Sequence, residues 1–457
     1  MPPETPLSES EDIQAVQENG PVYFRSIEVE NVLCFKSRQV LDLTDTNGYP
    51  AQWTVILGDN GVGKTTLLRC LAGMESRPSV FGLDMLVYIP RLSGIDSCIN
   101  QWESFSVLKL RKSQVRAIFQ LRYTITELNN GSSRKSLDPD SICCQEVMIG
   151  SPGTISQRFR ELKCYAYGAS RRIGQTSLVE SLESDSTASL FSDNATLLNA
   201  EEWLLQADYS IALSARTGTV NPKLERRYQL IIEILKELLP DVEDVRIVMA
   251  GENRSGAIAE FLTPYGWVPL SSLGLGYRTV IAWTVDLAAR MLDRYPDSDD
   301  PLSEPAVVLV DEIDLHLHPK WQRTIMTFLG DRFKNTQFIV TAHSPLVVQA
   351  AQNANLVILR REGNEVIIDN NPEIIKNWRV DQVLTSVFEL PTSLPADIEP
   401  LMERRAKLLS KSKLTAKDER ELKKLEDQIG TIPTAESRDD IRAMDIIRQA
   451  AKLLENR

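Results

Sequence analysis

The chain has 457 residues, of which 25% are charged, and a formal net charge of −12 at pH 7. This length allows a large core, in several domains or in one domain with sizeable insertions, and the acidic balance argues against a protein that coats nucleic acid indiscriminately. No apolar run approaches the roughly 20 residues of a membrane-spanning helix, and the six cysteines form no CxxC pair, so we expect a cytoplasmic protein with reduced thiols and no membrane partner.

The N-terminal part of the chain predicts a tail followed by strands. Residues 1–20 are polar and acidic and lack the apolar segment of a signal peptide, so we expect a disordered tail there. Residues 21–57 predict strands, because β-branched and aromatic residues recur near a period of two. The last strand, "WTVILG", ends at Gly58, and "KTTLLRCLAG" then predicts a helix that ends at Gly73.

The segment that joins this strand to this helix, "GDNGVGKTT" (58–66), matches the phosphate-loop pattern G-x-x-x-x-G-K-[ST]. In this pattern the glycines let backbone N–H groups approach phosphates, and the helix N-terminus adds partial positive charge. Lys64 is expected to reach the β- and γ-phosphates, and the Thr65 hydroxyl to coordinate Mg²⁺. We therefore predict binding of ATP and Mg²⁺, with nucleotide contacts from Asn60, Gly61, Val62, Gly63, Lys64, Thr65 and Thr66.

The middle of the chain predicts an insertion of helices and loops over about residues 100–265, in which residues 100–170 mix short strand-like and helical pieces. The Ser/Thr/Asp-rich stretch 173–198 predicts a long loop. The basic cluster "ASRRIG" (169–174) is either solvated surface or a phosphate contact. Two helices are expected after it, one with Asn199 as N-cap and an amphipathic one over 224–240.

A second anion cradle is predicted at "PLSSLGLGYRT" (269–279), which precedes an apolar helix. Serine hydroxyls, glycine backbone and a helix N-terminus together can bind an anion. The alternative is a tight loop before a buried helix. On the first interpretation, Ser272 and Gly274 are further candidate nucleotide contacts.

The stretch "VVLVDEIDLHLHPKWQ" (307–322) begins with an apolar run that predicts a buried strand. Two carboxylates, Asp311 and Glu312, follow this strand directly. Beside a phosphate loop, Asp311 is expected to hold Mg²⁺ through water. Glu312, a candidate catalytic residue, is expected to polarise the water that attacks the γ-phosphate.

The three histidines of the chain all lie in this stretch or in the strand "QFIVTAH" (337–343). Asp314, His316 and His318 would form a zinc site if the His-x-His pair were a ligand pair. The alternative is that both histidines pack at a turn. His343 ends the later strand, where an imidazole can contact a γ-phosphate, and we take it as the second candidate catalytic residue.

After about residue 380 the sequence becomes rich in Lys and Glu. "TAKDERELKKLEDQIG" (415–430) predicts a helix with Thr415 as N-cap, and a final helix follows. Their apolar stripes are thin, which suits docking better than independent folding. We therefore predict a nucleotide-binding head over 21–375 and a helical docking region over 376–457.

The order of phosphate loop, Ser-Gly cradle, "DEIDLHLHP" and strand-end histidine resembles the ABC-type ATPase heads of the RecF, SMC and overcoming-lysogenization-defect group, over roughly residues 22–345. The resemblance implies an α/β fold with a mixed, mostly parallel sheet and flanking helices. It also implies that Ser272 and Gly274 act as the signature motif, which contacts the γ-phosphate bound by another subunit. Here that motif is S-S-L-G-L-G rather than S-G-G-Q. The segment Leu315–Pro319 would be the D-loop at the subunit junction.

Within this group, "YGASRR" (167–172) and the C-terminal tail are most similar to the ATPase subunits of Septu-type anti-phage systems, the PtuA family. This narrower resemblance implies bacterial defence with DNA as the ultimate target. It also implies a homodimer or higher homo-oligomer, and an HNH nuclease partner of the PtuB type bound through the C-terminal helices.

The sequence also departs from the group. Where the group often has N-F-R-S-F, this chain has "NVLCF", with Leu33 in place of arginine, and Lys36 or Arg38 would have to substitute. Gln101 and Gln120 are the candidates for the glutamine loop. A RecF-like repair or chromosome clamp, and an ATP-gated scaffold with little turnover, are the alternative functions; the lack of long coiled-coil arms weighs against the SMC type.

Overall fold

The computed structural model divides the chain into two compact units, Met1–Val383 and Leu384–Arg457. The predicted tail over 1–20 and the predicted final helix lie outside the residues that the structure describes. The described residues are 22–30, 32–81, 85–90, 114–121, 142–148, 162–174, 185–218, 222–239, 241–249, 256–370, 372, 379–388, 390, 397–409 and 415–429.

The first unit contains a six-stranded sheet in the order β17–β16–β3–β15–β14–β8. Every residue of β3, β14 and β15 is buried, as expected for parallel strands covered on both faces. The predicted α/β class with a mostly parallel sheet is confirmed. Five strands are parallel, and β17 pairs antiparallel with β16 at the edge: β3 (Trp53–Gly58), β8 (Cys164–Tyr167), β14 (Ala306–Val310), β15 (Thr336–Thr341), β16 (Asn355–Glu362) and β17 (Glu365–Asp369).

A second, antiparallel sheet has the order β2–β1–β6–β7. Its strands β6 and β7 come from the predicted insertion, within residues 100–170, where short strand-like pieces were expected, and they extend the N-terminal sheet. The strand bounds are β1 (Val22–Glu30), β2 (Gln39–Asp42), β6 (Gln114–Leu121) and β7 (Ile142–Met148); β4 (Ser76–Phe81) and β5 (Met85–Pro90) form a separate hairpin.

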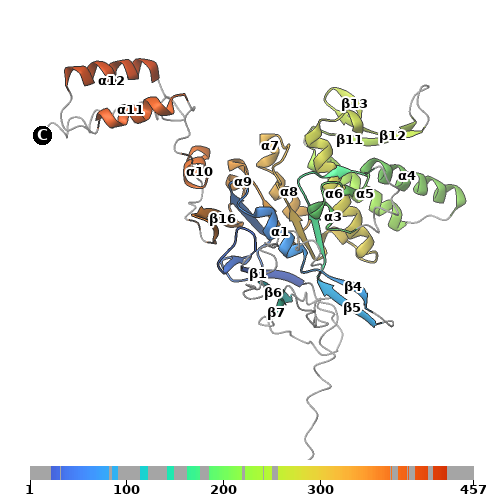
Figure 1. Ribbon diagram of the computed structural model, residues 1–457. Coiled ribbons are helices and arrows are strands. Elements are labelled where there is room, and N and C mark those ends of the chain that lie inside the picture. The colour runs from blue at the N-terminus through green and yellow to red at the C-terminus, as the bar shows by residue number, and fades with distance from the viewer. Residues whose placement is uncertain are drawn as a thin grey trace, which may run out of the picture. The chain divides into compact units, whose positions relative to one another are not determined.

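Helix α1 (Lys64–Ala72) lies in the core that the two sheets share, beside β1 in Figure 1. Seven of its nine residues are buried, so it is enclosed on several sides rather than amphipathic. Leu67 and Leu71 join Ile27 of β1 and Ile56 of β3 in one apolar cluster. Each such buried side chain contributes about 1.5–3 kcal/mol, which anchors the helix that follows the phosphate loop.

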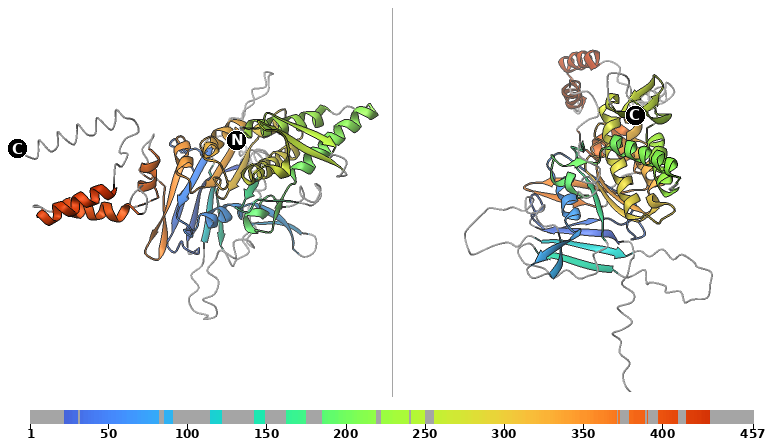
Figure 2. Two further views of the ribbon diagram at one scale, coloured as in Figure 1. Left: turned by 90° about the horizontal axis from the view of Figure 1, so that it is seen from above. Right: turned by 90° about the vertical axis from the view of Figure 1, so that its right-hand side faces the viewer.

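Helices α4, α5 and α6 pack against one another beside a small antiparallel sheet, β11–β12–β13, as Figure 2 also shows. The side chain of Asn199 accepts hydrogen bonds from Glu201 N–H and Glu202 N–H, which confirms the predicted N-cap. The bounds are α4 (Ala200–Thr217), α5 (Pro222–Leu238), β11 (Asp244–Met249), β12 (Ala257–Thr263), β13 (Gly266–Pro269) and α6 (Leu275–Arg294).

The predicted long loop over 173–198 is wrong in its described part. It contains α3 (Ala188–Phe191) and β10 (Thr196–Leu197), which pairs with β9 (Arg172–Ile173). Two of its serine hydroxyls are buried and bond to carbonyl groups of β8, the last strand of the sheet. Ser186 Oγ donates to Cys164 O at 2.8 Å and Ser189 Oγ donates to Ala166 O at 3.0 Å.

The remaining elements of the first unit are short helices after β14 and β15 and two 3₁₀ turns. None of the described helices is both long and apolar enough to span a bilayer. The bounds are η3 (Leu270–Ser272), η4 (Pro301–Ser303), α7 (Pro319–Gln322), α8 (Ile325–Arg332) and α9 (Pro345–Ala350).

In the second unit α11 (Glu399–Leu409) contacts α12 (Ala416–Ile429), and α10 (Val380–Ser386) lies at the unit boundary. Thr415 caps α12 as predicted: Asp418 N–H donates to Thr415 Oγ1 at 3.3 Å, and Thr415 N–H donates back to Asp418 Oδ2 at 3.0 Å.

Candidate nucleotide site

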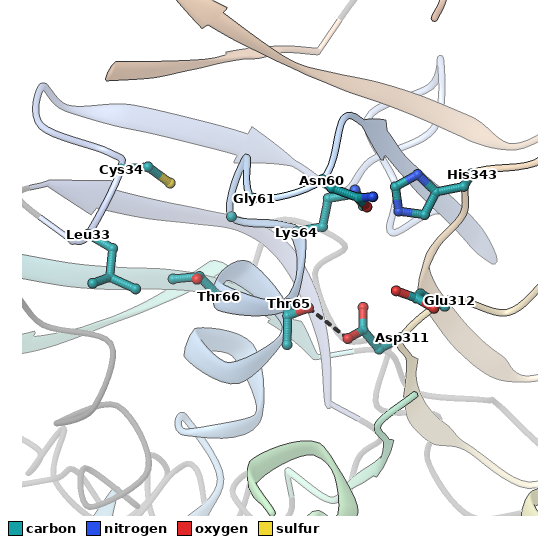
Figure 3. A pocket seen from close by; sticks show the side chains of 11 residues that line it. Leu33, Cys34, Asn60, Gly61, Lys64, Thr65, Thr66, Asp311, Glu312 and His343 are labelled. Atoms are coloured by element: carbon teal, nitrogen blue, oxygen red, sulfur yellow. Dashed lines mark hydrogen bonds between the residues drawn. The ribbon is translucent and has the colours of Figure 1, made fainter. Parts of the chain in front are cut away.

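The carboxyl ends of β3, β15 and β14 are adjacent in the sheet, and a pocket of about 270 Å³ opens there (Figure 3). Ligands of open α/β sheets typically bind at this edge of the strands. The pocket brings together residues from four separate segments of the chain. It is lined by Leu33, Cys34, Asn60, Gly61, Gly63, Lys64, Thr65, Thr66, Asp311, Glu312 and His343.

The phosphate loop depends on its glycines. Gly58, Gly61 and Gly63 have φ angles of 142°, 79° and 90°, which side-chain-bearing residues rarely adopt. A Cβ on Gly63 would also lie 2.6 Å from the Sγ of Cys34. The loop can therefore make its turn before α1 only with glycine at these positions.

The ammonium group of Lys64 is held over this loop. Its Nζ donates to the carbonyl oxygens of Gly58 at 2.8 Å and Asp59 at 2.7 Å. Burial lowers its pKa, against the opposing effect of Asp311 and Glu312. A bound phosphate would exchange these carbonyl contacts for stronger, charge-assisted ones.

Both carboxylate oxygens of Asp311 are fixed. Thr65 Oγ1 donates to Oδ2 and Thr341 Oγ1 donates to Oδ1, each at 2.7 Å. The Thr341 hydroxyl in turn accepts the N–H of Glu312 at 2.7 Å. Carboxylate and hydroxyl oxygens are the hard ligands that Mg²⁺ prefers, usually one or two of them beside several waters. Thr65 and Asp311 therefore fit a magnesium site.

Backbone strain is concentrated around this pocket. In the described part of the chain, four residues other than glycine have positive φ angles, which cost on the order of 1–3 kcal/mol each. Leu33 and Glu312 line the pocket, with φ of 44° and 50°. His316 and Arg171 are the other two, with φ of 62° and 37°. Such strain persists where surrounding contacts enforce it. At Glu312, both the backbone N–H and the backbone carbonyl are held by hydrogen bonds from other segments.

His343 lies at the pocket, two residues after the end of β15. Its N–H donates to Asp314 Oδ2 at 3.0 Å, which fixes the main chain that carries the imidazole. In Figure 3 the imidazole and the Glu312 carboxylate lie on the same side of the pocket.

The other two histidines do not line the pocket. His318 caps α7, where its Nδ1 accepts the N–H of Lys320 at 3.3 Å. The described residues contain no group of three His, Cys, Asp or Glu side chains that could hold a metal ion. The alternative zinc site of Asp314, His316 and His318 is therefore not formed.

Ser272 and Gly274 are exposed and do not line this pocket. Ser272 ends η3, and Gly274 is the N-cap of α6. Gly276 is the second residue of α6, and a Cβ there would lie 2.3 Å from the carbonyl oxygen of His316. The start of α6 and the segment after Glu312 are thus in direct contact within one chain.

Several residues around the site were not predicted, and several candidates do not take part. Thr341 and Cys34 lie in no predicted motif. Arg171 belongs to the basic cluster 169–174 and Leu33 stands where the group has arginine, but neither was predicted in its observed position; burial raises the pKa of the Cys34 thiol. Val62 is buried, and its carbonyl accepts a hydrogen bond from Cys34 Sγ. Lys36 and Arg38 are exposed and do not line the pocket, and Arg38 bonds to Glu28 at 2.6 Å. Gln101 lies outside the described residues, and the side chain of Gln120 is not described.

Comparison with known proteins agrees with the motifs. A family profile described as "AAA domain, putative AbiEii toxin, Type IV TA system" matches residues 177–349. The Septu protein PtuA of Bacillus mycoides is 26% identical over 416 residues, covering 89% of this chain and 50% of the relative. The chain is related to Septu PtuA. Its phosphate loop and paired acids, together with the AAA-type match over residues 177–349, agree with the resemblance that the sequence predicted.

Other relatives cover shorter segments. The "Retron Ec83 probable ATPase" of Escherichia coli is 30% identical over 248 residues, covering 54% of this chain and 42% of the relative. The chain spans about half the length of the curated relatives it matches. Among solved structures, an SMC head bound to the C-winged helix domain of ScpA aligns with 76% of this chain and 97% of its own, at 15% identity and a TM-score of 0.41.

Proposed function

We propose that the chain binds ATP with Mg²⁺ and hydrolyses it to ADP and phosphate. The observation that carries this proposal is the fixed Asp311 carboxylate, bonded to Thr65 in a pocket that also presents Lys64 and Glu312. The similarity to proteins named as probable ATPases supports it.

Each residue has a role that its position allows. Lys64 binds the β- and γ-phosphate oxygens, and Thr65 and Asp311 hold Mg²⁺, which neutralises phosphate charge when bound. Glu312 accepts a proton from the water whose oxygen attacks the γ-phosphorus, while the bond from that phosphorus to the ADP oxygen breaks. His343 donates a hydrogen bond to the γ-phosphate.

The direct test is steady-state phosphate release by the purified chain with Mg·ATP. Lys64→Ala is the control, because among the described residues that line the pocket it removes the one lysine, without touching Glu312. Release by the wild type and not by the variant supports the proposal. A wild-type chain that neither binds ATP nor releases phosphate would overturn it.

We further propose that two copies close around ATP, with Ser272 and Gly274 of one copy capping the nucleotide bound by the other. The exposure of both residues, and their absence from the pocket lining of their own chain, support this arrangement. The γ-phosphate would make these contacts only in the closed state, which is the differential affinity that a switch requires. At about 1.5–3 kcal/mol per charge-assisted hydrogen bond, a few bonds at two sites exceed the roughly 5.5 kcal/mol that inverts a 1:99 equilibrium.

The wider role that we propose is regulation, in the cytoplasm, of an HNH nuclease of the PtuB type that acts on DNA in anti-phage defence. The similarity to Septu PtuA over 89% of the chain supports it. The nuclease would dock on the C-terminal helices, including α11 and α12. The test is co-purification with an HNH nuclease of the PtuB type, with and without Mg·ATP. A matched chain truncated after residue 390 should lose the partner, and the absence of any partner with the full chain would contradict the proposal.

A second candidate is the ATPase of a retron system. It rests on local identities of 30% and 36% to the Retron Ec83 and Retron Vc95 probable ATPases. Mass spectrometry of the co-purified material separates the two, because a protein other than an HNH nuclease would favour the retron type.

A further inference from the structure

The strained turn at Glu312 has hydrogen bonds on both of its sides. On the amide side, Asp311 N–H donates to Tyr167 O at 2.8 Å and Glu312 N–H donates to Thr341 Oγ1. On the carbonyl side, Nη2 of Arg171 donates to both Asp311 O and Glu312 O, and Glu312 O also accepts the N–H of Leu315 at 3.0 Å. Buried backbone polar groups need such partners, so Arg171 completes the hydrogen bonding that this turn requires.

Arg171 is itself unusual. It lies just after β8, is 3% exposed and has a φ of 37°. Its Nε and Nη1 are buried and have no hydrogen-bond partner among the described residues. Burial lowers its pKa to about 10, so the guanidinium stays charged at neutral pH. A buried cation is costly unless anions compensate it, so its position calls for an explanation.

The compensating charges are those of the nucleotide site. Asp311, Asp314 and Glu312 all favour the charged form of Arg171. One oxygen of Asp314 is buried and unpartnered in the described structure, and the other holds the N–H of His343. Arg171 therefore contacts the segment that carries Glu312 and interacts electrostatically with Asp314, the residue that holds the N–H of His343, while it does not line the pocket itself.

We propose that Arg171 is a positioning residue for hydrolysis at this site. It fixes the turn that directs Glu312 into the pocket, and its charge balances Asp314, which holds the main chain of His343. This inference rests on the proposed ATPase function. Because Arg171 does not line the pocket, its loss should affect turnover and leave nucleotide binding almost unchanged.

The experiment compares Arg171→Met and Arg171→Lys with the matched control Arg172→Met. Arg172 is the neighbouring residue, and its side chain is exposed. In Arg171→Met we expect turnover to fall by about 10–10²-fold, as misplacement of catalytic groups does, while the Kd for Mg·ATP stays close to wild type. Arg171→Lys should recover part of the turnover, since it keeps the charge and loses the planar fork. Arg172→Met should match the wild type.

A second readout does not depend on turnover. Amide hydrogen exchange over residues 312–316, measured without nucleotide, should be faster in Arg171→Met and unchanged in α1. If the wild type released no phosphate, the ATPase proposal would fail, and the exchange data alone would still decide the role of Arg171. Wild-type exchange together with wild-type turnover in Arg171→Met would overturn the inference, as would equal changes in Arg172→Met. If Arg171→Met does not fold, the same two readouts in Arg171→Lys decide.

Discussion

The phosphate-loop face and the Ser272–Gly274 cradle of this chain differ in how complete they are. On the first face, Lys64, Thr65 and Asp311 already have hydrogen-bond partners inside the chain. The proposed cradle is exposed, and the N-cap of α6 is Gly274, which has no side chain to accept hydrogen bonds from the first N–H groups of the helix. A preorganised face beside an open one is what a site shared between two copies would require.

The residues that follow Ser272–Gly274, at the start of α6, are nevertheless held by packing and hydrogen bonds. The ring of Tyr277 packs edge-on against Trp321, with centroids 4.5 Å apart, and its hydroxyl donates to Asp241 at 2.6 Å. Gly276 lies against the carbonyl of His316. The proposed cradle is thus tied to the segment that follows Glu312, which would couple the nucleotide site to the surface that we propose meets the other copy.

The largest effect is expected from Glu312→Gln. The amide keeps the shape of the side chain, so Mg·ATP binding should persist, while loss of the general base should slow turnover by about 10²-fold or more. Phosphate release and equilibrium binding of a fluorescent ATP analogue measure the two quantities. Phosphate release at the wild-type rate would remove Glu312 from the mechanism.

Thr341→Val should have the next largest effect. It removes the hydroxyl that bonds both Asp311 and Glu312 N–H, and each buried group left unpaired costs roughly 1–3 kcal/mol. Thr336→Val is the matched control, because Thr336 is equally buried and its hydroxyl has no hydrogen-bond partner among the described residues. Urea denaturation should show a lower free energy of unfolding for Thr341→Val alone. Equal losses in both variants would argue that the hydroxyl network contributes nothing specific.

Gly276→Ala should have the smallest of these effects. The new Cβ would lie 2.3 Å from His316 O, and relief of such an overlap typically costs about 1–3 kcal/mol. Gly274→Ala is the comparison, since its nearest neighbour would be Tyr277 Cδ2 at 3.8 Å. Thermal unfolding should place Gly276→Ala below Gly274→Ala, and the reverse order would contradict the contact between α6 and His316.

The parts of the fold and site that could be predicted depend on local signals. The strand, glycine loop and helix around Lys64 are contiguous, and the caps at Asn199 and Thr415 act within a few residues. The buried strand before Asp311 is a short apolar run that β14 reproduces residue for residue.

The unpredicted parts depend on contacts between distant segments. Arg171 belongs to a basic cluster that resembles solvated surface, and only the pairing of β8 with β14 brings it to Asp311, 140 residues away. Thr341 ends a strand rich in β-branched residues, and nothing local distinguishes it from its neighbours. Its role follows only from the contact of its hydroxyl with Asp311. The stretch 173–198 has the composition of a loop, but the hydroxyls of Ser186 and Ser189 donate hydrogen bonds to backbone carbonyls of β8.

The central claim is that one nucleotide site uses residues of two copies, and a mixing experiment tests it most directly. Lys64→Ala keeps an intact cradle, and Ser272→Arg keeps an intact phosphate loop, so each variant alone should release little phosphate. Mixed with Mg·ATP, the two can form one complete site per heterodimer, and turnover should reappear along with a dimer in light scattering. A mixture no more active than the two separate variants combined, or a Ser272→Arg chain that is fully active alone, would contradict the shared site.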